Sequence, residues 1–208
     1  MKRIFLLFSF LLSLPLFAHS QEQVEESSRS AIGISSTFIG KGNIISIPGV
    51  DGAAGYSGDN YYTIAINYLY RINRVFQIET GMEYGKYHFI VSPSSSIPPP
   101  YDDYTYPIET YLLSIPITVR INFERFFFFN AGFSIDFDAN DNYYAAQDQG
   151  GIGFLMGFGF NYELKSGLSF FANPYLQMHH VIDFEKGNNA QKLTKAGIRI
   201  GATYTFHK

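Results

Sequence analysis

Cysteine and tryptophan are both absent from this chain of 208 residues. Without cysteine there is no disulfide and no thiolate ligand, which excludes zinc and iron–sulfur sites built on that residue. Charged residues are also scarce, at 16% of the sequence compared with about a quarter in an ordinary soluble domain. The formal net charge of −3 gives no basic surface for nucleic acid, so we expect no nucleic-acid partner.

Long apolar runs are missing as well, except at the start of the chain. Residues 1–20 combine a positively charged beginning, an apolar stretch over 4–14, and small residues at Ala18 and Ser20, which is the pattern of a secretory signal peptide. The apolar stretch is shorter than the roughly 20 residues of a membrane-spanning helix, and no cysteine follows it as in a lipoprotein leader. We therefore predict cleavage between Ser20 and Gln21, with 21–29 as a flexible periplasmic N-terminus.

What the chain does contain is aromatic residues and alternation. Aromatic residues make up 18% of the sequence, through 21 Phe and 16 Tyr. After residue 29, apolar and polar side chains alternate with a period of two, which is the signature of β-strands. The alternation predicts eight strands, at 30–39, 60–71, 74–90, 108–121, 125–138, 150–163, 168–181 and 194–206.

The connections between these segments alternate in length. Long ones cover 40–59, 91–107, 139–149 and 182–193, and short ones cover 72–73, 122–124 and 164–167. Long loops at one end and short turns at the other are the plan of an outer-membrane barrel, whose long loops face the cell exterior. We predict that residues 30–208 form one all-β domain, an eight-stranded antiparallel up-and-down transmembrane β-barrel in the bacterial outer membrane.

The two faces of the predicted strands differ in charge. One face is nearly free of charge, as contact with lipid requires, because a Lys or Arg at the bilayer midplane costs roughly 2–4 kcal/mol. A soluble lipocalin-like barrel would instead carry Lys and Glu on its outer face. We predict that the charged residues of the opposite face form an ion-pair network that plugs the polar lumen: Glu79, Glu83, Arg120, Asp136, Lys195 and Arg199. Because their strands are consecutive, Glu79 or Glu83, Arg120 and Asp136 are expected to meet.

Three local features give further expectations. His179 and His180 are adjacent on a strand, so they should point to opposite faces and not share a metal ion. The glycine-rich run 151–159 lacks the spacing of a nucleotide-binding loop and no helix follows it. Pro116 removes a hydrogen-bond donor in mid-strand, so we expect a bulge or a local break there. We expect no cofactor and no metal site.

The second long loop has an unusual composition. Residues 92–107 read SPSSSIPPPYDDYTYP, in which the three consecutive prolines favour polyproline II geometry. The tyrosines and aspartates after them form a candidate recognition surface, made of Tyr101, Asp102, Asp103, Tyr104 and Tyr106. A semi-rigid surface loop without a partner is the alternative.

Several segments resemble one known family. Residues 111–120 read YLLSIPITVR, which resembles the L-x-I-P segment, followed by hydrophobic residues and Lys or Arg, of the PorT-like small outer-membrane barrels. Residues 130–136 resemble the next strand of that family, and 151–162 its glycine-rich strand. The chain departs from the family at Ser114, where Glu is frequent, and in its last residues after Phe206. The resemblance implies an outer-membrane barrel. The founding member serves in a protein secretion system, but most relatives have no known activity, so no activity is implied.

The sequence therefore predicts a structural or interaction protein, not an enzyme, whose outer loops meet an envelope or extracellular protein. A narrow channel is the first alternative and requires an open lumen. A membrane-embedded hydrolase or acyltransferase is the second, and requires Ser, His and Asp to converge at one rim. A soluble secreted carrier is the third. The other expected partners are outer-membrane lipid, lipopolysaccharide and, during biogenesis, the barrel-assembly machinery.

Overall fold

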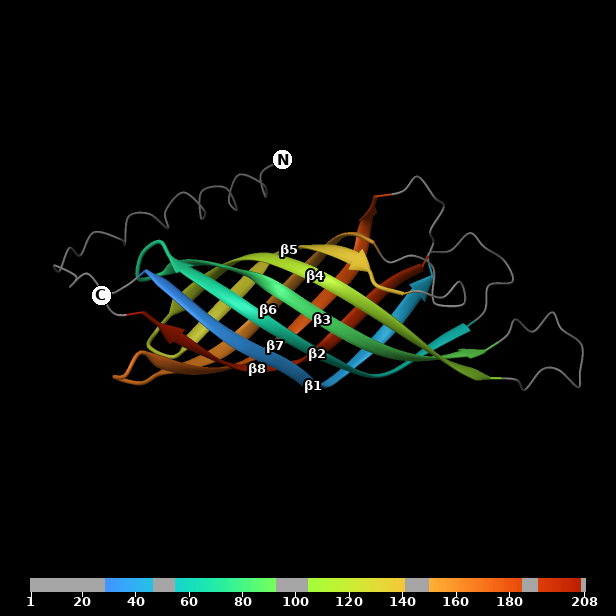
Figure 1. The fold of residues 1–208 in the computed structure, drawn as a ribbon, viewed down its shortest axis with the longest axis horizontal. Helices are drawn as coiled ribbons and strands as arrows, with labels where there is room; N and C mark the ends of the chain where they lie inside the picture. Colours follow the sequence, from blue (N-terminus) through green and yellow to red (C-terminus); the bar gives the residue numbers. More distant parts are fainter. Residues whose placement is uncertain (1–28, 47–54, 93–104, 141–149, 185–190, 207–208) are drawn as a thin grey trace, which may run out of the picture.

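The computed structural model describes residues 29–46, 55–92, 105–140, 150–184 and 191–206. In these ranges the chain forms eight β-strands, and no helix there is long and apolar enough to cross a membrane. The strands are β1 (Ser30–Ser46), β2 (Gly55–Arg71), β3 (Phe76–Ser92), β4 (Tyr106–Phe123), β5 (Phe127–Asp138), β6 (Gly151–Glu163), β7 (Leu168–Asp183) and β8 (Gln191–Thr205). Each strand pairs antiparallel with the next and β8 pairs with β1, so the sheet closes into a barrel (Figure 1). The predicted eight-stranded up-and-down topology is confirmed.

The barrel has two unlike ends (Figure 1). At one end β1 begins, β8 ends, and short turns cover 72–75, 124–126 and 164–167. We call this the turn end. At the opposite end, the loop end, the connections cover 47–54, 93–105, 139–150 and 184–190. The predicted placement of long and short connections is therefore confirmed, although most of the predicted boundaries shift by a few residues.

The strands extend further toward the loop end than the alternation predicts. β1 runs to Ser46, and not to residue 39. A bulge at Phe38 shifts its register with both neighbours, so the alternation of inward and outward residues breaks before the strand ends. Phe38 and Ile39 both face outward, after which Ile44 returns to the interior. The glycines on either side of Lys41 are typical of a loop, so the sequence pattern does not predict that the strand continues past them.

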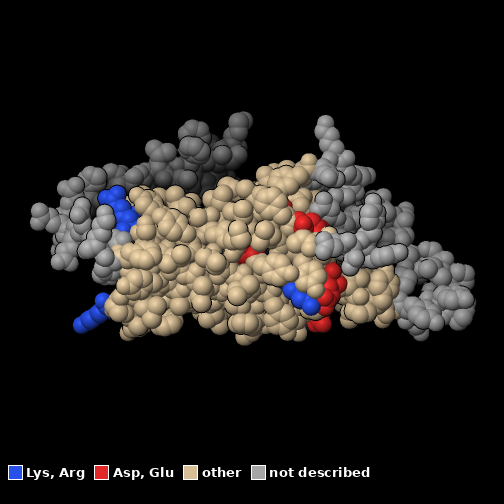
Figure 2. Space-filling model, in the orientation of Figure 1, with Lys and Arg blue, Asp and Glu red and all other residues tan. Residues whose placement is uncertain are grey.

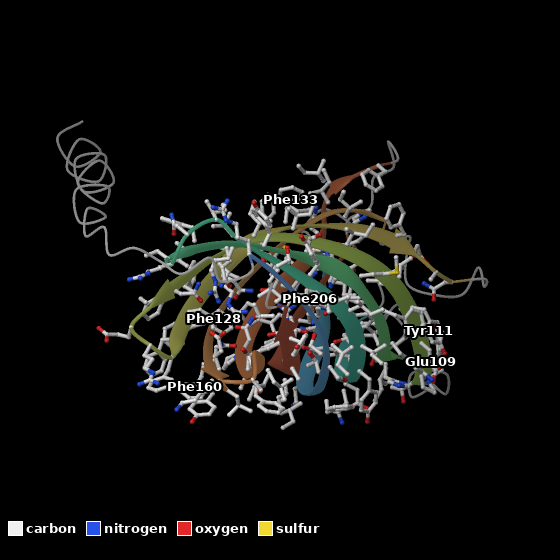
Figure 3. All side chains as sticks on the ribbon, turned by 60° about the vertical axis from the view of Figure 1, so that its left-hand side comes forward. Glu109, Tyr111, Phe128, Phe133, Phe160 and Phe206 are labelled. Carbon is white, nitrogen blue, oxygen red and sulfur yellow. The ribbon has the colours of Figure 1, made fainter. Side chains whose placement is uncertain are left out.

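The outer face of the barrel is apolar around its middle. Large apolar side chains are exposed there on every strand, and Figure 3 shows Phe133 and Phe160 outside the barrel and Phe128 inside it. In Figure 2 the charged side chains of the visible face gather toward the two ends, and the band between them is almost entirely uncharged. Stacked rings border this band at the turn end, as in the aromatic girdle of a membrane barrel. They are Phe123, Phe126, Phe127, Phe158, Phe160 and Tyr162.

Two prolines interrupt the hydrogen-bond ladders without shifting their register. Pro116 keeps its pairing with Ser134 of β5, whereas the ladder from β4 to β3 has a gap beside it. A similar gap lies between β7 and β6 beside Pro174. Proline has no N–H group, so each proline leaves one neighbouring strand without a donor. The predicted local break at Pro116 is confirmed, and it occurs without a bulge.

A bulge near the end of β7 redirects one histidine. The register between β6 and β7 shifts after Ile152, and His180 has a φ of 54°, in the left-handed region. Both His179 and His180 are buried as a result. The prediction that they point to opposite faces is therefore wrong, because a bulge breaks the strict alternation of a strand. They still have separate partners, since Nδ1 of His180 lies 2.8 Å from the carbonyl oxygen of Gly150.

Candidate functional site: the interior of the barrel

Inward-facing polar side chains fill the barrel in tiers. In the tier nearest the turn end, Arg120 of β4 and Arg199 of β8 share the carboxylate of Glu79 on β3. Nη1 of Arg120 lies 4.0 Å from Oε2 of Glu79, and Nη1 of Arg199 lies 3.7 Å from Oε1. All three side chains are buried. The guanidinium carbon of Arg120 also lies 3.4 Å from the ring centre of Phe128, a cation–π contact that offsets part of the cost of burying the charge.

The next tier toward the loop end is centred on Lys195. Its Nζ donates hydrogen bonds to Oε1 of Glu83 at 2.6 Å and to the hydroxyl of Tyr87 at 2.9 Å. The rings of Tyr61, Tyr87 and Tyr175 surround the ammonium group, with ring centres 5.4 to 5.7 Å away. The hydroxyls of Tyr61 and Tyr175 are hydrogen-bonded to each other at 3.2 Å. This buried lysine is therefore paired with a carboxylate and enclosed by aromatic rings.

Asp136 belongs to neither of these tiers. It pairs across the ladder with Ser114, and Arg120 lies six residues further along β4, a separation of about 20 Å. The prediction that Asp136 meets Arg120 is wrong for this reason. Oδ2 of Asp136 instead lies 2.9 Å from Nδ1 of His179 and accepts a hydrogen bond from the Ser134 hydroxyl at 3.1 Å. Alternation places His179 inside, but it does not identify this partner, because β5 and β7 are not neighbours in the sheet.

Toward the loop end, apolar side chains of β1, β2, β3, β4 and β8 fill part of the interior. A buried cluster, which we call the apolar cap, consists of Ile44, Tyr61, Tyr87, Phe89, Val91, Ile108, Leu112 and Leu193. The rings of Tyr61 and Tyr87 stack with centres 5.4 Å apart and connect the cap to the tier of Lys195. The sequence predicts a polar lumen and misses this cap. Ile44, Val91 and Leu193 fall in predicted loops, where no strand alternation indicates that a side chain points inward.

Glycines on the inner face make room for the largest rings. A Cβ atom at Gly159 would lie 2.2 Å from the ring of Phe128, and one at Gly197 would lie 2.2 Å from the hydroxyl of Tyr61. Any side chain at either position would displace a ring that contacts a buried cation. The glycine-rich run of β6 therefore serves packing.

A second polar cluster lies outside the barrel, on β3 and β4 toward the loop end. Oε2 of Glu109 accepts a hydrogen bond from the Tyr111 hydroxyl at 2.6 Å and lies 3.0 Å from Nζ of Lys86 (Figure 3). Nδ1 of His88 lies 3.4 Å from the other carboxylate oxygen. Tyr106 is exposed near the same end of β4. Of the predicted recognition surface it is the described member, whereas Tyr101, Asp102, Asp103 and Tyr104 lie outside the described residues.

The described residues include no group of three His, Asp or Glu side chains that could hold a metal ion. Ser134, Asp136 and His179 do come together, as the hydrolase alternative requires. However, the serine hydroxyl donates to the aspartate and not to the histidine, and all three residues have 0% exposure. In a hydrolytic triad the serine hydroxyl is hydrogen-bonded to the histidine, and the substrate must be able to reach the serine. This arrangement therefore links β5 to β7 inside the barrel.

Solved structures of similar fold come from bacterial surface proteins. Neisserial surface protein A superposes with a TM-score of 0.52 at 16% sequence identity, covering 88% of this chain and 100% of that chain. The outer membrane protein AlkL, solved in lipid bilayers, superposes with a TM-score of 0.52 at 11% identity, covering 91% of this chain and 96% of that one. At these identities the likeness concerns the fold alone. A search of curated proteins gives no match.

The chain is also similar to a protein family. Residues 17–185 match the family described as outer membrane protein beta-barrel domain. The match covers most of the chain and includes the strands from β1 to β7. It agrees with the closed sheet, the apolar outer band and the charged interior. The chain therefore belongs to the outer membrane protein beta-barrel domain family, and its barrel sits in the outer membrane.

Proposed function

We propose that this protein is a closed barrel that acts through the surface at its loop end, and neither as a conduit nor as an enzyme. The proposal depends on one observation, which is that buried side chains occupy the interior of the barrel along its length. The tier of Glu79, the tier of Lys195 and the apolar cap follow one another from the turn end to the loop end. A barrel of about eight strands has room inside for side chains and little more. A solute would have to separate buried ion pairs and then cross an apolar cluster.

The surface at the loop end supports an interaction role. In outer-membrane barrels the long loops face the cell exterior, so this orientation places Glu109, Lys86 and Tyr106 outside the cell. Exposed tyrosines mixed with charged groups suit protein recognition, because Tyr supplies contact area and a hydrogen-bonding hydroxyl at a low entropic cost. The partner in this proposal is an envelope or extracellular protein.

The channel alternative makes an opposite prediction in planar lipid bilayers. We expect no steady conductance from the parent protein after insertion, under conditions in which a large porin conducts. Heat-modifiable migration on a denaturing gel of protein recovered from the same membranes shows that the barrel is inserted and folded. A stable open current from such a preparation would overturn the closed-barrel proposal and support a narrow channel.

Two finer assignments are also proposals. The YLLSIPITVR segment of β4 supports a place among the PorT-like barrels, without a shared secretion role. The leader supports cleavage between Ser20 and Gln21, followed by insertion through the barrel-assembly machinery. The intact mass of the purified outer-membrane protein tests the cleavage, because it should equal that of a chain beginning at Gln21. A mass that retains residues 1–20 would contradict it.

A further inference from the structure

A basic hollow lies at the turn end of the barrel and reaches inward to Arg120. It has a volume of about 230 Å³, and its lining includes five arginines and two glutamates. The arginines are Arg29, Arg71, Arg74, Arg120 and Arg125, and the glutamates are Glu124 and Glu163. Figure 2 shows Lys and Arg side chains at this end of the molecule. The hollow therefore gathers five of the seven arginines of a chain whose formal net charge is −3.

Carboxylates within reach do not balance these arginines. Glu163 lies 3.7 Å from Arg71. At the inner end of the hollow, Arg120 shares Glu79 with Arg199, so that one carboxylate serves two cations. Among the described residues, no carboxylate oxygen lies within 4.0 Å of a nitrogen of Arg29, Arg74 or Arg125.

Arg120 gives a second and independent indication of a ligand. Its side chain is 3% exposed, its Nη1 is 4.0 Å from the nearest Glu79 oxygen, and its Nε has no hydrogen-bond partner. A buried guanidinium with an unused donor is costly, because charge-assisted hydrogen bonds are lost without replacement. Arg120 lines the hollow, so an anion that enters from the turn end approaches this side chain.

We propose that this hollow binds a phosphate group. The guanidinium fork presents paired N–H donors that match phosphate oxygens, and a phosphate has enough acceptor oxygens for several arginines at once. In the orientation proposed above, the turn end faces the periplasm, and the aromatic girdle beside it marks the level of the inner-leaflet headgroups. Inorganic phosphate and the phosphate of a phospholipid headgroup share this chemistry. The site is separate from the loop-end surface and does not depend on the closed-barrel proposal.

Titration calorimetry tests the site with two probes. The refolded protein in a neutral detergent is titrated with inorganic phosphate, and in a parallel series with micelles that contain phosphatidylglycerol. Saturable binding of one phosphate per chain in either series supports the site, and the series in which it occurs identifies the source. Absence of saturable binding in both series at millimolar concentrations overturns the proposal.

Variants at the rim separate this site from general attraction of anions to a basic surface. Arg74 and Arg125 are exposed in turns, so the double variant Arg74→Gln, Arg125→Gln should fold normally and bind phosphate at least about tenfold more weakly. Lys165→Gln is the matched control, because Lys165 is exposed in another turn of the same end and does not line the hollow. The control should bind like the parent. Equal affinity in the double variant and the control would refute the assignment.

Discussion

The Nζ atom of Lys195 lies 2.6 Å from Oε1 of Glu83, with 0% of the lysine side chain and 6% of the glutamate side chain exposed. The two residues come from β8 and β3, which are not neighbours in the sheet, so their contact spans the interior of the barrel. Because the pair is removed from water, either partner alone would be an uncompensated buried charge. Removing one partner should therefore lower the free energy of unfolding by more than the net contribution of the ion pair to stability.

Replacing one member of this pair should be more harmful than replacing both. We expect Lys195→Met or Glu83→Gln alone to lower the free energy of unfolding by about 3–5 kcal/mol, because each leaves the other group unpaired. The double variant should lose less than either single variant, because it leaves no unpaired buried charge. Urea titrations of the protein refolded into lipid vesicles measure these differences.

The exposed pair of Lys86 and Glu109 provides a matched control. Its atoms are 3.0 Å apart, but the side chains are 36% and 43% exposed. Lys86→Met should leave the urea midpoint close to that of the parent, since water stabilises the glutamate that remains. Losses of equal size in Lys86→Met and Lys195→Met would contradict the importance of burial.

Arg120 should be needed for its shape as well as for its charge. Its guanidinium lies 3.4 Å from the ring centre of Phe128, while Glu79 keeps a second partner in Arg199. Arg120→Ala should lower the free energy of unfolding by about 2 kcal/mol or more, because it removes a desolvated cation–π contact. Arg120→Lys should recover little of this loss, since an ammonium group lacks the planar face that stacks on the ring. Full recovery by lysine in the same urea titrations would show that charge alone matters.

The sequence predicts the barrel well because alternation repeats along every strand. A period of two places Glu79, Arg120 and Arg199 on the inner face without knowledge of any contact, and the structure places them there. Alternation fails where a bulge inserts a residue, as at Phe38 and His180, because the parity of the following residues then changes.

Contacts across the interior are harder to predict than faces. Parity does not give the height of a residue in the barrel, which depends on the register and tilt of the strands. Asp136 and Arg120 share a face on neighbouring strands, but the ladder separates them by about 20 Å. The pairing of Asp136 with His179 depends on distances across the bore, which a linear pattern does not contain.

Glycine on the inner face should be required at some positions and not at others. A Cβ atom at Gly159 would lie 2.2 Å from the ring of Phe128, so Gly159→Ala should cost about 1–3 kcal/mol of stability through overpacking. Gly42→Ala is the control, because its Cβ atom would meet its nearest neighbour, Tyr87, at an ordinary 3.6 Å. Equal unfolding midpoints for Gly159→Ala and Gly42→Ala would contradict this account.

The orientation of the barrel can be tested with single cysteines, because the parent chain has none and gives no background labelling. Ser95→Cys lies in the connection between β3 and β4 at the loop end, and Lys165→Cys lies in the turn between β6 and β7 at the turn end. Long loops face the cell exterior in outer-membrane barrels, so a membrane-impermeant maleimide should label Ser95→Cys on intact cells and leave Lys165→Cys unlabelled. Both variants should react once the outer membrane is permeabilised, which shows that each thiol is accessible.

Labelling of Lys165→Cys on intact cells, with Ser95→Cys protected until permeabilisation, would reverse the orientation. The outer-face cluster of Glu109 and Lys86 would then face the periplasm, and the basic hollow around Arg120 would face the medium.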